Sequence, residues 1–393
     1  STEKSLSIKD PTDDSKELCK LNYTSTGFKL TYNKVKMTNN VVDVATGSTE
    51  KLDILSMMYN NTELNVAKAV NIYEGTMPSS QYWHSVCYGN DKYVAIAYNS
   101  NAFAYSTDGI NWTQGTMPSN QRWYSICYGN DKFVVVSGGN SDSNVFAYST
   151  DGINWTQGTM PSSQYWCSIC YGNGKFVAIA FNSNAFAYST DGINWTQGTM
   201  PYTAHWITVC YGNDRYVSLI RLTNVFAYST DGINWTLSNK MSGADMWQSI
   251  CYGNGKFVAV VYNSNVFAYS TDGINWTQSN MPSYQTWYSV CYGNGKFVAI
   301  AYNSNVFAYS TDGINWTEGN MPSNWWSSVC SDNNDSFVAI AIDTDVFAYM
   351  YLPSTYHKGI KTTFSVKYSW NNAPDGMIST VPNERSYANG ANV

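Results

Sequence analysis

The stretch Tyr-Ser-Thr-Asp-Gly-Ile-Asn-Trp-Thr recurs six times along the chain, and this repetition constrains the fold more than any other feature. The copies begin at Tyr105, Tyr148, Tyr188, Tyr228, Tyr269 and Tyr309. Successive copies are 40 to 43 residues apart. A period of this length indicates a repeat architecture, in which each unit is a small group of elements that packs against its neighbours.

Each unit contains four short runs rich in β-branched and aromatic residues, separated by turn-forming residues. In one unit these runs are 287–292, 296–302, 306–309 and 314–317. Four short strands in about 40 residues are typical of one blade of a β-propeller.

Two other signals recur seven times rather than six. A Trp begins the first strand of every unit, and Phe-Ala-Tyr occurs in every third strand, the last copy at 347–349. The last unit has no fourth strand of its own, but 72–78 supply an extra copy before the first unit. We therefore predict an all-β protein: a seven-bladed β-propeller of four-stranded blades over residues 70–351, closed by the N-terminal strand, which leaves no exposed sheet edge.

Residues 1–69 and 352–393 flank this predicted propeller. Both flanks contain strand-like runs, beginning at Phe28 and Ile360, and a short helix capped by Ser48 is predicted at 49–60. Because closure of the ring brings the two flanks together, we predict that they form one discontinuous base domain, α+β or all-β, with the propeller inserted into one of its loops. Two separate appendages are the alternative.

Composition excludes some functions. The chain has 22 Lys and Arg against 28 Asp and Glu, a net charge of −6, and no basic stripe. Nucleic acid is therefore not an expected partner, since phosphate binding needs clustered cations. The 16% of aromatic residues suits β-structure and contact surfaces for sugar or protein. No apolar run is typical of a signal peptide or long enough to cross a bilayer.

Seven of the nine cysteines occupy one position of the repeat: Cys87, Cys127, Cys170, Cys210, Cys251, Cys291 and Cys330. Equivalent positions of neighbouring units should lie too far apart for a disulfide, so we interpret them as small buried residues. Cys19 and Cys167 are extra. Free thiols favour synthesis in a reducing cytoplasm. The six Asn-Trp-Thr glycosylation sequons argue against a eukaryotic secretory route.

The segment Ser-Thr-Asp-Gly-Ile-Asn-Trp resembles the Asp-box, or bacterial neuraminidase repeat, although it is one residue shorter between Asp and Gly. In that family the box is the turn between the third and fourth strands of a blade. The resemblance covers residues 70–351 and implies a structural role. Asp would accept backbone amides, Gly would allow a positive φ, and Trp would pack between sheets. The residues concerned are Asp108, Trp112, Asp151, Trp155, Asp191, Trp195, Asp231, Trp235, Asp272, Trp276, Asp312 and Trp316.

The best-known activity of that family does not carry over. Sialidases need three clustered arginines, and the three of the predicted propeller stand at different positions of the repeat: Arg122, Arg215 and Arg221. Acids outside the boxes and turns, Asp245 and Glu318, are isolated, although paired carboxylates for glycoside hydrolysis are not excluded.

The histidines show no metal-ligand spacing, and neither a phosphate-binding loop nor a nucleophile elbow occurs. They are His84, His205 and His357. We expect no enzymatic activity, no metal site and no cofactor.

The units differ from one another in two loops, which precede the first strand and follow the second. In a propeller these loops share one face. They are rich in aromatic residues and in the amides Asn99, Asn182, Asn263 and Asn303. Rings and amides suit a sugar or a protein epitope. Drift on a tolerant loop face is the alternative. The candidate ligand-binding residues are Tyr82, His84, Arg122, Tyr124, Tyr165, His205, Arg221, Tyr284 and Trp325.

The near-identical repeats resemble the Asp-box propellers of tail-associated and fibre-like bacteriophage proteins. This implies a non-enzymatic structural protein of a phage or phage-tail-like particle, made in the bacterial cytoplasm without a signal peptide. Residues 1–69 and 352–393 would contact other particle proteins, with the chain oligomeric in the assembly. The propeller would contact a host-surface glycan or protein, without inserting into a membrane. A free-standing propeller lectin and a purely decorative or assembly protein are the alternatives. A hydrolase of surface polysaccharide lacks a visible catalytic set.

Overall fold

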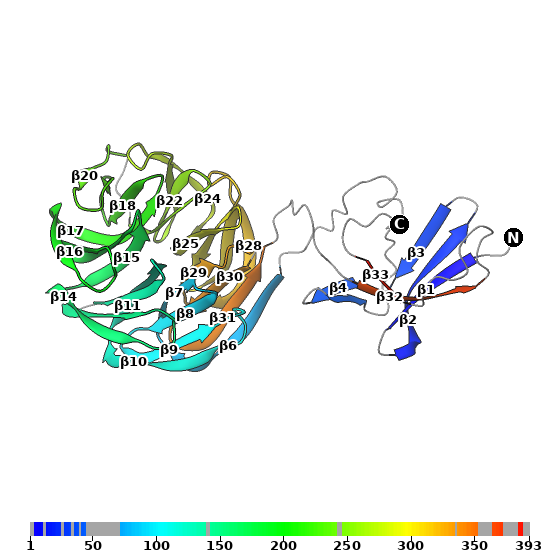
Figure 1. Ribbon diagram of the computed structural model, residues 1–393. Coiled ribbons are helices and arrows are strands. Elements are labelled where there is room, and N and C mark those ends of the chain that lie inside the picture. The colour runs from blue at the N-terminus through cyan, green and yellow to red at the C-terminus, as the bar shows by residue number, and fades with distance from the viewer. Residues whose placement is uncertain are drawn as a thin grey trace. The chain divides into compact units, whose positions relative to one another are not determined.

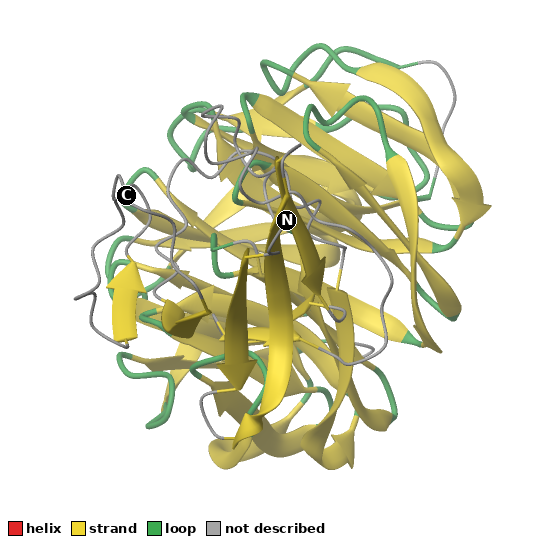
Figure 2. Ribbon diagram, turned by 90° about the vertical axis from the view of Figure 1, so that its right-hand side faces the viewer, coloured by secondary structure: helices red, strands yellow, loops and turns green. Residues whose placement is uncertain are grey.

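The computed structural model describes residues 4–10, 13–24, 27–32, 35–38, 41–44, 71–138, 142–241, 246–334, 336–352, 364–371 and 384–387. All regular secondary structure in these segments is β-strand, joined by turns and loops (Figures 1 and 2). No helix that could cross a membrane is found among them. The chain divides into two compact units, Ser1–Ala67 with Thr355–Val393 and Lys68–Ser354.

The smaller unit contains one five-stranded antiparallel sheet in the order β3-β2-β1-β32-β33. Its strands are β1 (Lys4–Asp10), β2 (Asp13–Thr24), β3 (Gly27–Tyr32), β32 (Phe364–Asn371) and β33 (Glu384–Tyr387). β1 pairs with β32 from Ser5↔Asn371 to Ile8↔Tyr368, so the two flanks share a sheet. A separate hairpin joins β4 (Val35–Thr38) and β5 (Val41–Val44). The helix predicted at 49–60 lies outside the described residues, and an anchoring role for this unit stays a prediction.

The larger unit is a β-propeller (Figure 1). Five of its sheets have four antiparallel strands. Their strands are β7 (Trp83–Gly89), β8 (Lys92–Ala97), β9 (Ser100–Ser106) and β10 (Thr113–Gln121); β11 (Trp123–Gly129), β12 (Lys132–Ser137), β13 (Ser143–Ser149) and β14 (Thr156–Gln164); β21 (Trp247–Gly253), β22 (Lys256–Val261), β23 (Ser264–Ser270) and β24 (Thr277–Gln285); β25 (Trp287–Gly293), β26 (Lys296–Ala301), β27 (Ser304–Ser310) and β28 (Thr317–Asn324); and β29 (Trp326–Ser331), β30 (Ser336–Ala341), β31 (Thr344–Tyr351) and β6 (Asn71–Gln81).

The remaining sheet has six strands rather than four. They are β15 (Trp166–Gly172), β16 (Lys175–Ser189), β17 (Thr196–Gly212), β18 (Arg215–Ile220), β19 (Ala227–Ser229) and β20 (Thr236–Leu237). Hydrogen bonding therefore gives six sheets in this unit, and the predicted count of seven four-stranded blades is wrong in this respect. The reason is local: Phe181 pairs with His205, so β16 and β17 continue without a break and join two units into one sheet.

The last sheet is closed by the N-terminal strand, as predicted. β6 pairs with β31 from Tyr351↔Asn71 to Thr344↔Gln81, and the two lie side by side in Figure 1. The inner strand segments also form a closed ring, because β7, β11, β15, the end of β17, β21, β25 and β29 each contact the next and β29 contacts β7. Serine hydroxyls join them: the Val86 N–H donates to Ser328 Oγ at 3.2 Å and the Ile169 N–H to Ser125 Oγ at 3.2 Å.

The burial pattern explains why these segments become strands. In most inner strands, as in Trp83–Gly89, buried residues recur at every third position, whereas Lys92–Ala97 and its equivalents are buried along nearly their whole length. An uninterrupted apolar run is what a strand covered on both faces requires. The seven hydrophobic clusters of the described residues each contain one fully buried Trp.

Candidate binding face

The repeated turns lie between the third and fourth strands of a unit, and their polar groups bond to one another. In the first copy the Asp108 carboxylate accepts from the backbone N–H groups of Ile110 and Asn111 at 2.9 and 2.7 Å, and from the Asn111 side-chain amide at 2.7 Å. Ser106 Oγ donates to Asp108 at 2.9 Å and accepts the Gly109 N–H at 2.9 Å. Gly109 has a φ of 74°, which favours glycine.

The other five copies repeat this geometry. Partial burial acts to raise the pKa of Asp108, but the hydrogen bonds from Asn111, Ile110 and Ser106 outweigh it and lower the pKa to about 2. The carboxylates are thus ionised and occupied by the turn itself. Among the described residues, no three or more His, Cys, Asp or Glu side chains lie where they could hold a metal ion.

The Trp that ends each repeated turn packs between two sheets. The Trp155 ring lies 5.8 Å from Phe103 in β9 and 6.4 Å from Phe133 in β12, measured between ring centroids. Side-chain amides add further bonds between units, as where Asn130 Nδ2 donates to the Thr190 carbonyl at 3.2 Å. We call the face that carries these turns the box face.

The opposite face, here the loop face, carries the turns between second and third strands and the junctions that precede each inner Trp. Backbone bonds place the residue before the Trp beside the residue that follows the second strand. The Tyr98 N–H donates to the Tyr82 carbonyl at 2.8 Å, and the Arg221 N–H donates to the His205 carbonyl at 2.9 Å. The units therefore place these two residues side by side, as a pair of side chains except where Gly138 is paired with Arg122, and the predicted binding residues fall largely in these pairs.

Five of the nine predicted residues lie in one continuous chain of ring contacts, here the first arc. Successive ring centroids are 6.0 Å apart for Tyr82 and His84, 4.1 Å for His84 and Tyr124, and 5.4 Å for Tyr124 and Tyr165. From Tyr165 the chain continues through Phe181, at 5.2 Å, to His205, at 4.7 Å.

Burial and hydrogen bonding set the charge of this arc. Burial lowers the pKa of His84 to about 4, although the hydrogen bond with the Tyr124 backbone acts to raise it. The ring is therefore neutral at pH 7. Its Nδ1 lies 2.7 Å from the Tyr124 carbonyl oxygen, which places the proton of the neutral ring on Nδ1. Burial also raises the pKa of Tyr165 to about 12. Arg122 brings a positive charge, with its guanidinium carbon 6.0 Å from the centre of the Tyr98 ring.

The other three predicted residues lie apart from the first arc. Arg221 stacks over Tyr262 at 5.6 Å. Trp325 is 44% exposed, stacks on Tyr302 at 6.1 Å and donates from Nε1 to Asn303 Oδ1 at 3.0 Å. Tyr284 is 63% exposed, the most open aromatic residue of the described propeller.

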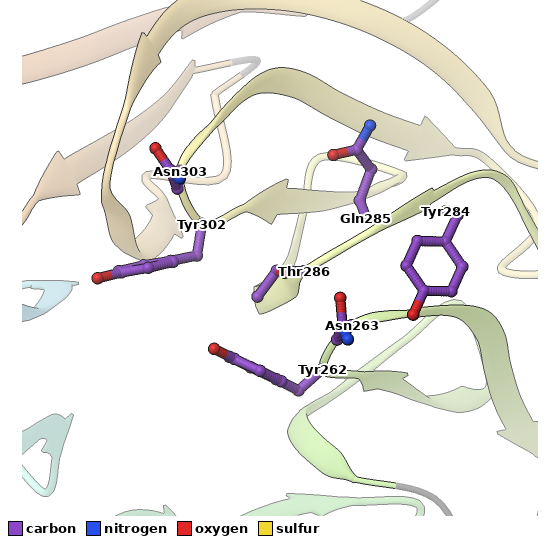
Figure 3. A pocket seen from close by; sticks show the side chains of 7 residues that line it. All are labelled: Tyr262, Asn263, Tyr284, Gln285, Thr286, Tyr302 and Asn303. Carbon is purple, nitrogen blue, oxygen red and sulfur yellow. The ribbon is translucent and has the colours of Figure 1, made fainter.

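A groove of about 320 Å³ opens beside Tyr284 between two neighbouring sheets. Figure 3 shows its lining residues, with the Tyr262 and Tyr302 rings projecting in the same direction and Thr286 between their bases. They are Tyr262, Asn263, Tyr284, Gln285, Thr286, Tyr302 and Asn303.

Sequence reasoning singled out Tyr284, Asn263 and Asn303 but missed the two groove tyrosines. The sequence did contain a signal for them. The residue that follows the second strand, directly before the recurring Asn-Ser, is aromatic in four units: Tyr98, Phe181, Tyr262 and Tyr302. The turn itself favours Asn, because Asn263 and Asn303 have φ values of 55° and 51°.

The described cysteines are not suited to act as nucleophiles. Eight cysteines have described side chains and none is in a disulfide. Burial raises the thiol pKa, as at Cys170, which disfavours the nucleophilic thiolate. His357 and Asp245 lie outside the described residues, and Glu318 is exposed.

No family model matches the sequence, and no curated protein matches it. Solved structures resemble the fold. Virginiamycin B lyase from Staphylococcus aureus is 14% identical, with 72% of this chain and 100% of that chain covered and a TM-score of 0.65; a catalytically inactive form of it was solved with quinupristin. YCF48 from Cyanidioschyzon merolae is 13% identical over 71% of this chain and 98% of that one, with a TM-score of 0.56. The β-propeller domain of Cps50 (Swd1) from Myceliophthora thermophila is 9% identical over 72% and 100%, with a TM-score of 0.56.

At these identities the likeness concerns the fold alone. It supports a β-propeller and does not point to the Asp-box family, to a phage particle or to carbohydrate binding, so these three expectations remain proposals.

Proposed function

We propose that this chain is a non-enzymatic structural and binding protein of a phage or phage-tail-like particle, and that its loop face contacts a glycan or protein on the host surface. The observation that carries the binding part is the first arc: an unbroken series of aromatic contacts from Tyr82 to His205 on the face where the units differ. Rings bring large apolar area at a small entropic cost, which suits recognition surfaces.

The chemistry of this face supports binding more than catalysis. Its described polar groups are mostly phenols and amides, with the imidazoles of His84 and His205, the cations Arg122 and Arg221, and the exposed carboxylates of Asp343 and Asp345 beside the turn between β30 and β31. A general acid or base has to be held near its substrate with a pKa close to the working pH. The pKa values of His84 and Tyr165 are both shifted further from pH 7.

The particle assignment rests on sequence character, namely the near-identical repeats, the free thiols and the flanking unit. In this proposal residues 1–69 and 352–393 dock on other particle proteins and the chain acts as an oligomer within the assembly. Its place of action is the particle surface, after synthesis in the bacterial cytoplasm.

We also propose that the six-stranded sheet acts as two repeat units, so that the ring has seven repeat units, six of which carry the Asp-box-like turn. Seven fully buried tryptophans support this, as does the pairing of the end of β17 with β18 from Trp206↔Ile220 to Gly212↔Arg215, the pattern of the other units.

The similarity to lyase structures makes an enzyme the second candidate. Incubation of the full chain with quinupristin, followed by mass spectrometry, tests it. We expect the mass of quinupristin to stay unchanged; its conversion by the wild type would replace the non-enzymatic proposal.

Binding is tested with the full chain on an array of bacterial surface glycans and on whole bacterial cells. The comparison is between wild type and the double variant Tyr165→Ala, Trp325→Ala. Saturable wild-type binding that the double variant loses, at a temperature where both proteins are folded, is the expected result. Absence of binding to every glycan and cell type would instead favour a decorative or assembly protein, and equal binding by both proteins would exclude this face.

A further inference from the structure

The position directly before the inner Trp holds a small side chain in one unit only. It carries Thr286 before Trp287, whereas the other units have Tyr82, Arg122, Tyr165, His205, Met246 and Trp325. The exception coincides with the groove, which Thr286 lines.

The larger side chains show what fills this position elsewhere. Tyr82 packs against Tyr98 and Tyr165 against Phe181, each with 5.2 Å between ring centroids, so the ring before the Trp lies beside the ring after the second strand. Thr286 has no ring to place beside Tyr302, although the backbone bond of the pair is kept, with the Tyr302 N–H donating to the Thr286 carbonyl at 2.8 Å. The groove therefore occupies the space that an aromatic side chain fills in those two units.

Two aromatic rings border this space, and neighbours within the chain support both. The Arg221 guanidinium carbon lies over the Tyr262 ring, 5.6 Å from the ring centroid. Tyr302 has Tyr288 at 5.4 Å and Trp325 at 6.1 Å. These contacts fix the two rings, and both also line the groove (Figure 3).

The polar groups of the groove are oriented hydrogen-bonding groups. Gln285 Oε1 accepts from Ser304 Oγ at 3.0 Å and Asn303 Oδ1 accepts from Trp325 Nε1 at 3.0 Å. Because each amide oxygen is held, each amide NH₂ is directed as a donor. The lining residues include no Asp, Glu, Lys, Arg or His.

We propose that this groove is a subsite for one neutral saccharide ring, bordered by Tyr262 and Tyr302 and hydrogen-bonded by the amides. Sugar rings combine apolar C–H faces with hydroxyl acceptors, which matches two aromatic rings and amide donors. The volume of about 320 Å³ is at the lower end for small-molecule sites, which suits a single sugar ring. This inference rests on the proposed binding function and names its ligand class.

Saturation-transfer NMR on the full chain tests the subsite, with methyl α-D-glucopyranoside, methyl α-D-mannopyranoside, methyl β-D-galactopyranoside and methyl N-acetyl-β-D-glucosaminide as neutral probes. Methyl β-D-glucuronide is the charged comparator. We expect at least one neutral probe to bind with a dissociation constant in the millimolar range, which corresponds to about 4 kcal/mol, and more tightly than the glucuronide.

Thr286→Tyr is the diagnostic variant, because it introduces the residue that two other units carry at this position. It should weaken binding of the neutral probe by about ten-fold or more, as expected when a binding pocket is filled. Tyr202→Ser is the matched control, since Tyr202 is 38% exposed, packs on Trp206 and lies outside the groove. It replaces a surface tyrosine with the Ser that the equivalent position 162 carries, and should leave binding unchanged.

Three results would overturn the subsite: no neutral probe binds the wild type, the glucuronide binds more tightly than every neutral probe, or Thr286→Tyr binds as the wild type does while keeping its melting temperature. Glycan-array and cell binding by Thr286→Tyr distinguishes a failure of the subsite from a failure of the proposed function. If binding there is unchanged, the subsite fails and the recognition role of the loop face stands.

Discussion

On the box face six copies of one turn share the same residues and the same hydrogen bonds, whereas on the loop face no two units present the same set of side chains. The box carboxylates and serine hydroxyls bond within their own turns, as Asp191 and Ser189 do. The loop face instead exposes large groups such as Tyr284 and Trp325. Within one repeat architecture, identity between units therefore marks structure, and divergence marks the surface that is free to acquire a partner.

The largest expected difference is in the stability cost of replacing two tryptophans. Trp166 is fully buried, so Trp166→Ala should lower the free energy of unfolding by about 3–5 kcal/mol. Trp325→Ala should change it by about 0.5 kcal/mol or less, because the side chain lies at the surface. Urea unfolding of both full-chain variants measures the difference. Equal losses would mean that the loop face also supports the fold.

The second effect concerns a single box. Asp191→Ala removes the acceptor of the Ile193 and Asn194 N–H groups, at 2.8 Å each, and should cost about 1–3 kcal/mol of stability. Tyr284→Ala on the loop face is the control and should change stability by about 0.5 kcal/mol or less. Thermal unfolding compares them, and a box variant as stable as this control would contradict the structural role of the turn.

Sequence reasoning reached most of the fold because the repeat encodes it locally. The Trp and Phe-Ala-Tyr signals located the strands, and the extra segment at 72–78 located the closing strand β6. The continuous pairing of β16 with β17 could not be predicted, since it depends on Phe181 meeting His205 across two strands. The groove was missed for a similar reason: the small size of the Thr286 side chain matters only once its neighbours in space are known.

A third, smaller effect is a difference in pH dependence between the faces. Burial lowers the pKa of His84 from 6.5 to about 4, so protonation favours the unfolded chain. The stability that neutral His84 contributes is complete above pH 6.5 and is lost as the pH falls to about 4. We expect a loss of about 1–2 kcal/mol after allowing for partial exposure, and His84→Phe should abolish it.

The box face should respond at lower pH. The hydrogen bonds of the turn outweigh burial and lower the pKa of Asp108, Asp272 and Asp312 from 3.8 to about 2. Their contribution is complete above pH 3.8 and is lost as the pH falls through about 2. Urea unfolding between pH 7 and 4 isolates the His84 effect, and a wild-type curve that His84→Phe leaves unchanged would contradict the assignment.

Our central claim is that the loop face recognises a partner while the box face maintains the scaffold. The most direct measurement is saturable binding to bacterial cells by two full-chain variants, Tyr165→Ala with Trp325→Ala on the loop face and Asp191→Ala on the box face, both assayed at a temperature where they are folded. We predict that the loop-face variant loses binding and the box-face variant retains it. Binding that persists in the loop-face variant and disappears in the folded box-face variant would contradict the claim.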